Sequence, residues 1–198
     1  MFETYPTLGP GLRTTVVHEC VRRNALLTIA SEGRKRVDCA GMLDACFRIA
    51  YRCAYGLMRV YWTALRPHTH GSLVAIWVNN RILLVKNSYV RYLNLPGGYV
   101  KTGETAIEAA RRELREEVGI SVDLDMLKPC LDESHVWEAK QERLEMFELE
   151  LSEEPTIRVD NREVVSATFY DADAALGLNL FPLIRKHIEQ RIRQAVRS

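Results

Sequence analysis

The stretch Gly98 to Ile120, GYVKTGETAIEAARRELREEVGI, decides how the rest of the chain is interpreted. Its part from Thr105 to Val118 is rich in Ala, Glu and Arg and contains neither Gly nor Pro. Gly119 follows at the position where helices commonly end. We therefore predict a helix over residues 105–118, preceded by a glycine-containing loop.

Three glutamates share one face of this predicted helix. Glu113, Glu116 and Glu117 lie at i, i+3 and i+4, so their carboxylates project in similar directions. Like charges so close repel one another, and a hard divalent cation would relieve that repulsion. Oxygen ligands with no His or Cys nearby select Mg²⁺ or Mn²⁺ over zinc. The alternative is a solvated acidic helix face, which the carboxylates alone do not exclude.

The residues around the helix add to the metal hypothesis. Pro96-Gly97-Gly98 opens the loop and Gly103 interrupts it again, which lets backbone approach a ligand closely and frees a carbonyl to point at a metal. Glu104 lies just before the helix, and Arg112 follows eight residues later.

Together these residues resemble the Nudix box, GX5EX7REUXEEXGU with U aliphatic, and every fixed position is matched between Gly98 and Ile120. The stretch EVVSATFYDAD, which begins at Glu163, also resembles the order of a Nudix domain. The resemblance implies an α/β fold, a Nudix-type α/β/α sandwich with a mixed β-sheet, here preceded by an N-terminal helical extension. Residues 1–67 are not covered by it.

The resemblance also implies an activity and a small-molecule nucleotide substrate. Such enzymes hydrolyse a diphosphate linkage in a nucleoside diphosphate joined to another moiety, with Mg²⁺ as cofactor and Mn²⁺ as a substitute. Carried over by position, Glu113, Glu116 and Glu117 would hold the metal, and the Gly97 carbonyl would be a further ligand.

Three more residues receive roles from the resemblance. Glu104 would assist at the metal, and Arg112 would pair with a box carboxylate and hold it in place. Glu163 is the candidate in a later loop for the base that deprotonates the attacking water, although a box glutamate is the alternative. Glu163 could equally be a surface residue paired with Arg162 at the start of a strand.

The sequence says less about the substrate. Relatives that act on ADP-ribose often carry a proline about 15 residues beyond the box, where this chain has His135 and Val136. The longer motif of coenzyme A relatives and the downstream tyrosine of dinucleoside polyphosphate hydrolases are also incomplete or missing.

Candidate substrate residues lie on both sides of the box. Lys86, Arg91 and Tyr92 precede it, where a phosphate or base could be met, and Trp137 or Phe147 could stack on a base. For each of them, surface charge or core packing is the alternative.

The remaining pattern predicts strands and one further helix. Leu73–Val78 and Ile82–Val85 are β-rich and joined through Asn79-Asn80, which indicates a hairpin. Further strand candidates are Val90–Leu95, Ile120–Leu131, Leu144–Leu151 and Val164–Tyr170. An amphipathic helix over Phe181–Val196 closes the domain. Strands mixed with helices without a regular βαβ repeat predict a mixed sandwich.

The N-terminal part differs in texture, and we place a boundary near Pro67. Residues 1–41 show no clear periodicity, residues 42–67 form a helical extension, and residues 68–198 form the catalytic domain. Translation from Met42 is a hypothesis that follows from this division.

The helix predicted over residues 43–66 carries a narrow stripe of Arg48, Arg52, Arg59 and Arg66 in an otherwise apolar surface. Such a helix could lie on an anionic membrane. The favoured alternative is packing against the domain or against a second subunit, as a homodimer.

Composition excludes several classes of protein. The chain has 198 residues, with 27 Lys and Arg against 26 Asp and Glu, and 47% of it is hydrophobic. This balance argues against a disordered chain and against strong nucleic-acid binding. The near-neutral total hides a basic N-terminal third and an acidic remainder.

The five cysteines lack CxxC spacing, and no segment resembles a secretory leader or a membrane span, so we expect reduced thiols and a cytoplasmic location. Cys39, Cys46 and Cys53, spaced by seven, are expected on a buried helix face.

Two other functions remain open from the sequence. One is a non-catalytic Nudix scaffold whose N-terminal helix binds a partner or a membrane. The other is an isomerase on the same fold, which would need Cys130, the one cysteine in the domain, to face the substrate.

Overall fold

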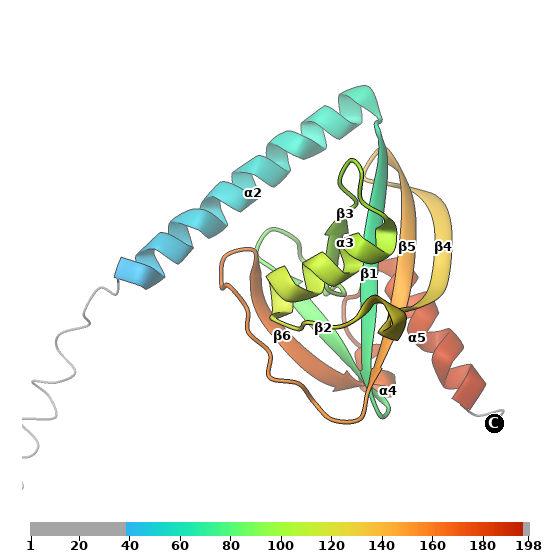
Figure 1. Cartoon of the computed structure of the whole chain (residues 1–198). Helices are drawn as coiled ribbons and strands as arrows, with labels where there is room; N and C mark the ends of the chain where they lie inside the picture. Colours follow the sequence, from blue (N-terminus) through green and yellow to red (C-terminus); the bar gives the residue numbers. More distant parts are fainter. Residues whose placement is uncertain (1–38, 196–198) are drawn as a thin grey trace, which may run out of the picture. The chain divides into compact units, whose positions relative to one another are not determined.

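A computed structural model of the chain describes residues 39–195 (Figure 1). Of these, residues 43–195 belong to one compact unit. The expectations for residues 1–38 lie outside the described residues, and the hypothesis of a start at Met42 stays a prediction. Among residues 39–195, no helix is both long and apolar enough to cross a membrane.

A six-stranded sheet forms the centre of the domain. Five strands follow the order β4-β5-β1-β2-β6, and β3 pairs with β1 away from this path. Their bounds are β1 (His68–Val78), β2 (Arg81–Asn87), β3 (Gly97–Tyr99), β4 (Lys128–Trp137), β5 (Lys140–Leu151) and β6 (Val164–Asp171). Strands β1 and β5 are parallel and the other pairs are antiparallel, so the sheet is mixed, as predicted.

The predicted hairpin joins β1 and β2. Trp77 pairs with Ile82 and Val78 with Arg81, which leaves Asn79 and Asn80 as a two-residue turn. Asn79 has a φ of 55°, a left-handed conformation that Asn tolerates better than most residues.

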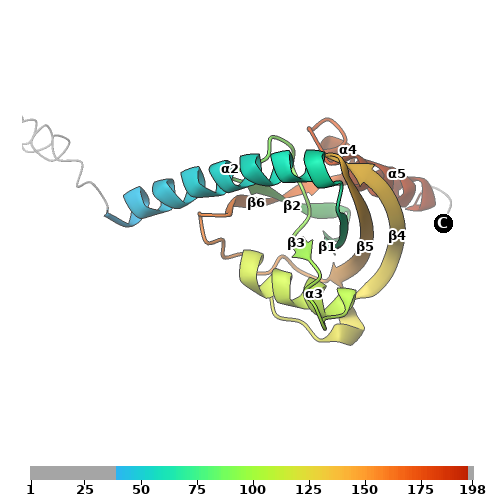
Figure 2. The same ribbon diagram turned by 90° about the horizontal axis from the view of Figure 1, so that it is seen from above.

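Both faces of the sheet are covered, because successive residues of a strand point to opposite sides. Val74 and Ile76 pack into one core cluster with residues of α3 (Ala106–Glu113). Ala75 and Trp77 pack into the other with residues of α4 (Ala172–Ala175) and α5 (Pro182–Ala195). Figure 2 shows α3 on one side of the sheet and α4 and α5 on the other, which confirms the α/β/α sandwich.

Two predicted strands are wrong. Val90–Leu95 contains only isolated bridges, Val85 with Asn94 and Leu93 with Leu180. Residues 120–127 are a loop with a 3-10 turn at Leu124–Met126, and the strand begins only at Lys128. Ile120 and Leu127 of that loop are buried in the α3 cluster and Val122 packs against it, so their alternation reflects packing over the core rather than strand pairing.

The predicted N-terminal helix is present as α2 (Cys39–Leu65). Its arginine stripe faces the domain: Arg48 Nε donates to the Asn161 carbonyl and Arg52 Nε to the Ser88 carbonyl. This geometry supports packing on the domain over contact with a membrane. Cys46 and Cys53 are exposed, so the expectation of a buried cysteine face is wrong for them, because the helix turns the side with Arg48, Tyr55 and Trp62 toward the domain instead.

Candidate active site

The helix that carries the box is built as its sequence indicates, with one exception at its end. Thr105 caps α3 through a capping box with Glu108. The last turn, Leu114–Val118, is π-helical, and Gly119 ends it with a φ of 73°. A π-turn widens the helix locally and is common at functional sites. The sequence predicted a regular helix over the whole of residues 105–118, so the π-helical geometry of the last turn was not predicted.

The π-turn places Glu117 inside the protein, where only 8% of the residue is exposed. One carboxylate oxygen accepts a hydrogen bond of 2.8 Å from the Gly97 amide. Burial raises the pKa of Glu117 to about 8, and the negative charges of Glu113, Glu163 and Asp160 add to this effect. A buried carboxylate among other carboxylates is a group that a bound cation would stabilise.

Strand β3 brings two glycines against these carboxylates. A Cβ on Gly98 would lie 2.5 Å from Glu113 Oε1, and a Cβ on Gly97, whose φ is 150°, would collide with the Ser72 carbonyl. At Gly97 only glycine fits, because the backbone of β1 is so close, whereas a side chain at Gly98 would have to displace the Glu113 carboxylate. The Gly97 amide that binds Glu117 shows that this backbone faces the carboxylate cluster.

Arg112 forms hydrogen bonds with the three other glutamates at fixed positions of the box. Its guanidinium donates to Glu104 twice, at 2.9 and 3.0 Å, to Glu113 at 2.5 Å and to Glu116 at 3.2 Å. A further hydrogen bond reaches the Tyr99 carbonyl. The Arg112 hydrogen bonds lower the pKa of Glu104 to about 2, so Glu104 stays charged.

Glu163 lies at the start of β6 and lines the same cavity as Glu113 and Glu116. The Tyr89 hydroxyl donates to Glu163 Oε1 at 2.9 Å. Burial raises the pKa of Glu163, and Glu113, Asp160 and Glu116 raise it further. Arg162 pairs with Asp44 of α2 at 3.0 Å, so the described contacts of Arg162 do not favour the surface pairing with Glu163.

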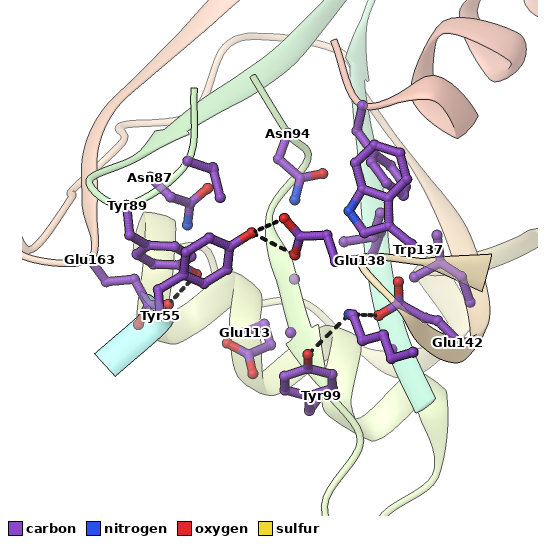
Figure 3. A pocket seen from close by; sticks show the side chains of 18 of the residues that line it. Tyr55, Asn87, Tyr89, Asn94, Tyr99, Glu113, Trp137, Glu138, Glu142 and Glu163 are labelled. Carbon is purple, nitrogen blue, oxygen red and sulfur yellow. Dashed lines mark hydrogen bonds and ion pairs between the residues drawn. The ribbon is translucent and has the colours of Figure 1, made fainter. Parts of the chain in front are cut away.

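A cavity of about 430 Å³ extends from these carboxylates (Figure 3). Of the candidate substrate residues, Tyr92 and Trp137 line it. Lys86 and Arg91 do not: the Lys86 ammonium turns back to the Val90 carbonyl, and Arg91 is exposed. Phe147 is buried in the core.

Several lining residues were not predicted from the sequence. They are Tyr55, Trp62, Asn87, Tyr89, Asn94, Tyr99, Glu138, Lys140 and Glu142. For Tyr55 and Trp62 a signal existed, because they lie seven residues apart on the arginine face of α2. The others depend on which loops the fold brings together, which the local sequence does not reveal.

Asn87 stands out among the lining residues. It is only 5% exposed, and its side-chain oxygen is buried without a hydrogen-bond partner among the residues that the structure describes. A buried amide oxygen without a partner costs free energy. In Figure 3 the Asn87 amide lies on the wall of the cavity, so a ligand with N–H donors would satisfy it.

The box residues fit a divalent cation by chemistry. Glu113, Glu116 and Glu117 supply only oxygen donors, and Glu117 is buried with a raised pKa. Arg112 now lies between Glu113 and Glu116, so a cation would require the half-exposed Glu116 side chain to move away from the guanidinium.

A second cluster, Cys130, Glu148 and His187, is the one group in residues 39–195 whose potential ligand atoms already lie within 4.8 Å of one another. Arg191 is 3.3 Å from Glu148 and neutralises it, which disfavours a cation there. Cys130 does not line the cavity, so the structure offers no support for the isomerase alternative.

Comparison with known families gives a direct result. Residues 68–191, more than half of the chain, match the family model of the NUDIX domain. The chain belongs to the Nudix family. Members of this family generally use a divalent metal ion.

Two curated relatives match shorter parts of the Nudix domain. A putative 8-oxo-dGTP diphosphatase of Bacillus subtilis (strain 168) is 45% identical over 58 residues, 29% of this chain and 39% of the relative. An ADP-ribose pyrophosphatase of Methanocaldococcus jannaschii is 47% identical over 45 residues, 21% of this chain and 27% of the relative. The match therefore spans less than half the length of either relative.

Solved structures share the fold. The crystal structure of a MutT NUDIX hydrolase from Burkholderia pseudomallei superimposes with a TM-score of 0.55 at 24% identity. The similarity covers 62% of this chain and 97% of that chain. Helix α2 precedes the family match and is an addition to the Nudix domain of this chain.

Proposed function

We propose that this Nudix protein is a hydrolase that cleaves a phosphoric anhydride bond in a nucleoside diphosphate linked to another moiety, with Mg²⁺ or Mn²⁺ as cofactor. The observation that carries the proposal is the buried Glu117, which is hydrogen-bonded to Gly97 in the wall of a cavity large enough for a nucleotide. A carboxylate buried among other carboxylates has no structural advantage without a cation.

The box residues would hold the metal. Glu113, Glu116 and Glu117 are the carboxylate ligands, and the Gly97 carbonyl is a further ligand from the same stretch of β3. When bound, the ion supplies charge neutralisation at the phosphate oxygens and lowers the pKa of a bound water. Arg112 keeps Glu113 in place and balances the charge of Glu116 until the ion arrives and takes over that carboxylate.

Glu163 is the proposed base. The pKa of Glu163 is raised toward neutral pH, so its carboxylate accepts a proton from water more readily than that of an ordinary glutamate does. The Tyr89 hydroxyl holds one carboxylate oxygen and leaves the other free to accept that proton. Glu104 acts at a distance by anchoring Arg112.

The far end of the cavity suits a planar, polar ring. Tyr92, Trp137 and Phe181 pack together there with ring centroids 4.9 to 6.0 Å apart. Asn87 offers a buried amide to N–H donors of a base. The putative 8-oxo-dGTP diphosphatase and the ADP-ribose pyrophosphatase named above both have nucleotide substrates, which supports this class without selecting one member.

A substrate screen tests the proposal. Deoxynucleoside triphosphates, 8-oxo-dGTP, dinucleoside polyphosphates, nucleotide sugars and ADP-ribose are incubated with Mg²⁺ or Mn²⁺, and products are separated by chromatography. Hydrolysis in ¹⁸O-labelled water then identifies the attacked phosphorus. Nucleotide binding with no product from any compound would favour the non-catalytic scaffold and refute the enzyme.

Self-association is the second part of the proposal. The outward face of α2 carries uncharged residues spaced alternately by three and four, all of them exposed: Leu43, Cys46, Ala50, Cys53, Leu57, Val60 and Ala64. This is the spacing of a coiled-coil seam. The charged side chains of this part of α2 all contact the domain instead. A second copy of the chain, related by a two-fold axis, would bury this face without opposing charges.

A further inference from the structure

Helix α2 contacts the loop that carries Glu163 at several successive residues. Arg48 Nε donates to the Asn161 carbonyl at 2.7 Å. Asp44 pairs with Arg162 at 3.0 Å, and the Arg162 guanidinium lies 4.4 Å from the centre of the Phe47 ring. The loop immediately before Glu163 is therefore attached to the first half of α2.

The same loop includes a tight turn. Asn161 has a φ of 60°, a left-handed conformation, and the Asp160 carboxylate accepts from the Arg162 amide at 3.0 Å. Residues 160–162 are exposed, so few core contacts hold this turn and contacts from a neighbouring element add support. The contacts of Asp44 and Arg48 with residues 161 and 162 provide that support from outside the family domain.

A second loop links α2 to the side chain of Glu163. Arg52 Nε donates to the Ser88 carbonyl at 2.9 Å, and the Ser88 amide donates to the Glu163 carbonyl at 2.8 Å. The neighbouring Tyr89 ring lies 6.2 Å from Tyr51 and 5.0 Å from Tyr55, measured between ring centroids. Its hydroxyl donates to Glu163 Oε1.

Both supports of Glu163 thus lead back to α2. Its backbone is held through Ser88 and through residues 160–162, and its carboxylate is held through Tyr89. Burial, together with the Glu163 charge, keeps the pKa of Tyr89 above its ordinary value, so the phenol remains a donor. Figure 3 shows Tyr55, Tyr89 and Glu163 in contact along one wall of the cavity.

The second half of α2 closes the cavity on the same side. The Tyr55 hydroxyl donates to both oxygens of Glu138, at the tip of the β4–β5 hairpin, at 2.6 Å. Trp62 is 4% exposed, and the centre of its ring lies 4.8 Å from the Lys140 ammonium nitrogen. These contacts fix the helix at a second point, so the first half cannot swing away independently.

We propose that α2 is a positioning element of the Nudix active site: Asp44, Arg48 and Arg52 hold the two loops, and Tyr51 and Tyr55 hold Tyr89, so that the Glu163 carboxylate faces the metal-binding glutamates. Tyr89 and these α2 residues are positioning residues that act through Glu163. The inference rests on the proposed function for the role of Glu163, but the contacts belong to a helix outside residues 68–191.

The closing experiment uses the full chain with two positioning variants. Tyr89→Phe removes the hydroxyl and keeps the ring, and the double variant Asp44→Asn, Arg48→Gln removes the charges that make two loop contacts and keeps polar side chains at both positions. We expect kcat to fall about 10-fold in the first and about 3- to 10-fold in the second, with KM changed less than about 2-fold, because misplacement of a reacting group lowers the rate of the chemical step. Ile49→Gln on the outward face of α2 is the matched control and should leave kcat unchanged.

To distinguish positioning of Glu163 from a general structural role, the Tyr89→Phe and the Asp44→Asn, Arg48→Gln changes are repeated in a Glu163→Gln background. If they act through Glu163, they should lower kcat no further there. Equal falls in both backgrounds would overturn the proposal. Circular dichroism and thermal unfolding identify any variant that fails to fold.

Hydrogen exchange tests the support without any activity. Exchange of the Ser88 and Arg162 amides should rise about 10-fold in the double variant and not in Ile49→Gln, because both amides report opening of the supported loops. Unchanged exchange would overturn the proposal even if the protein hydrolyses nothing. Absence of all turnover in the wild type, with raised exchange in the variant, would instead refute the proposed function alone.

Discussion

Replacement of Glu117 by glutamine should stabilise the metal-free protein while it abolishes most of the activity. Glu117 is 8% exposed, and the pKa of its carboxyl is raised from 4.5 to about 8, chiefly by burial. Folding at pH 7.5 must therefore either bury a charge or take up a proton. At about 1.4 kcal/mol per pH unit this costs about 2 to 4 kcal/mol, which a neutral amide avoids. The amide oxygen still accepts the hydrogen bond of the Gly97 amide.

For a folded unit of this size, that gain corresponds to an increase in Tm of about 5 to 12 °C. Thermal unfolding in EDTA at pH 7.5 measures it. With saturating Mg²⁺, turnover should fall at least about 100-fold, because a charged metal ligand is lost. Glu116→Gln, at a half-exposed position, should lose activity without a comparable gain in stability, and Glu153→Gln on the surface should change neither. A Glu117→Gln variant that is less stable than the wild type without metal, or fully active with Mg²⁺, would refute the reasoning.

Four further predictions follow from described contacts. A group whose pKa is raised in the folded state contributes stability that is present below its unfolded pKa and lost as pH rises through its folded pKa. Because of Glu117, the metal-free protein should therefore lose stability between about pH 4.5 and 8. The increase in Tm caused by Mg²⁺ should be larger at pH 8.5 than at pH 6. Gly98→Ala should displace the Glu113 carboxylate and weaken Mg²⁺ binding about 10-fold or more in calorimetric titration, since the new Cβ would meet Glu113 Oε1; unaltered affinity would contradict the close approach. Gly56→Ala, in the exposed interior of α2 with no heavy atom within 4 Å of the new Cβ, should raise the free energy of unfolding by about 0.5 to 1 kcal/mol in denaturant titrations. Leu57→Glu should convert a dimer formed through α2 to monomer in light scattering after gel filtration, whereas a wild type that is already monomeric would refute the pairing.

The parts of the fold that could be predicted are those with strong local signals. The Asn79-Asn80 turn, the box helix with its glycine end, and the arginine stripe of α2 each combine residue type with spacing. The strand over residues 120–127 could not be excluded from sequence, because apolar alternation looks the same whether a segment pairs in a sheet or covers a core as a loop. The π-turn at Leu114–Val118 also leaves no local signal, since the same residues would form an ordinary helix.

The candidate site divides in the same way. The spacing of the three box glutamates suggested a metal site without excluding a solvated acidic face, and the roles of Gly97 and Arg112 came from the resemblance to the Nudix box. Asn87, Tyr89 and Lys140 come from three different segments, and only the register of the sheet and the packing of α2 bring them to one cavity. Lys86 and Arg91 were plausible because they precede the box, but a single residue of offset along an extended chain turns a side chain to the opposite face.

The tryptophans give the molecule an optical property. Two of its three indoles, Trp62 and Trp137, line the cavity, and the third, Trp77, is fully enclosed in the core beside α5. A nucleobase that enters the cavity would stack near the first two and leave the third untouched. Intrinsic fluorescence, excited near the red edge of indole absorption, should therefore be partly quenched as nucleotide binds, while a constant component from Trp77 serves as an internal reference. Ligand affinity can then be followed without a label or an attached dye.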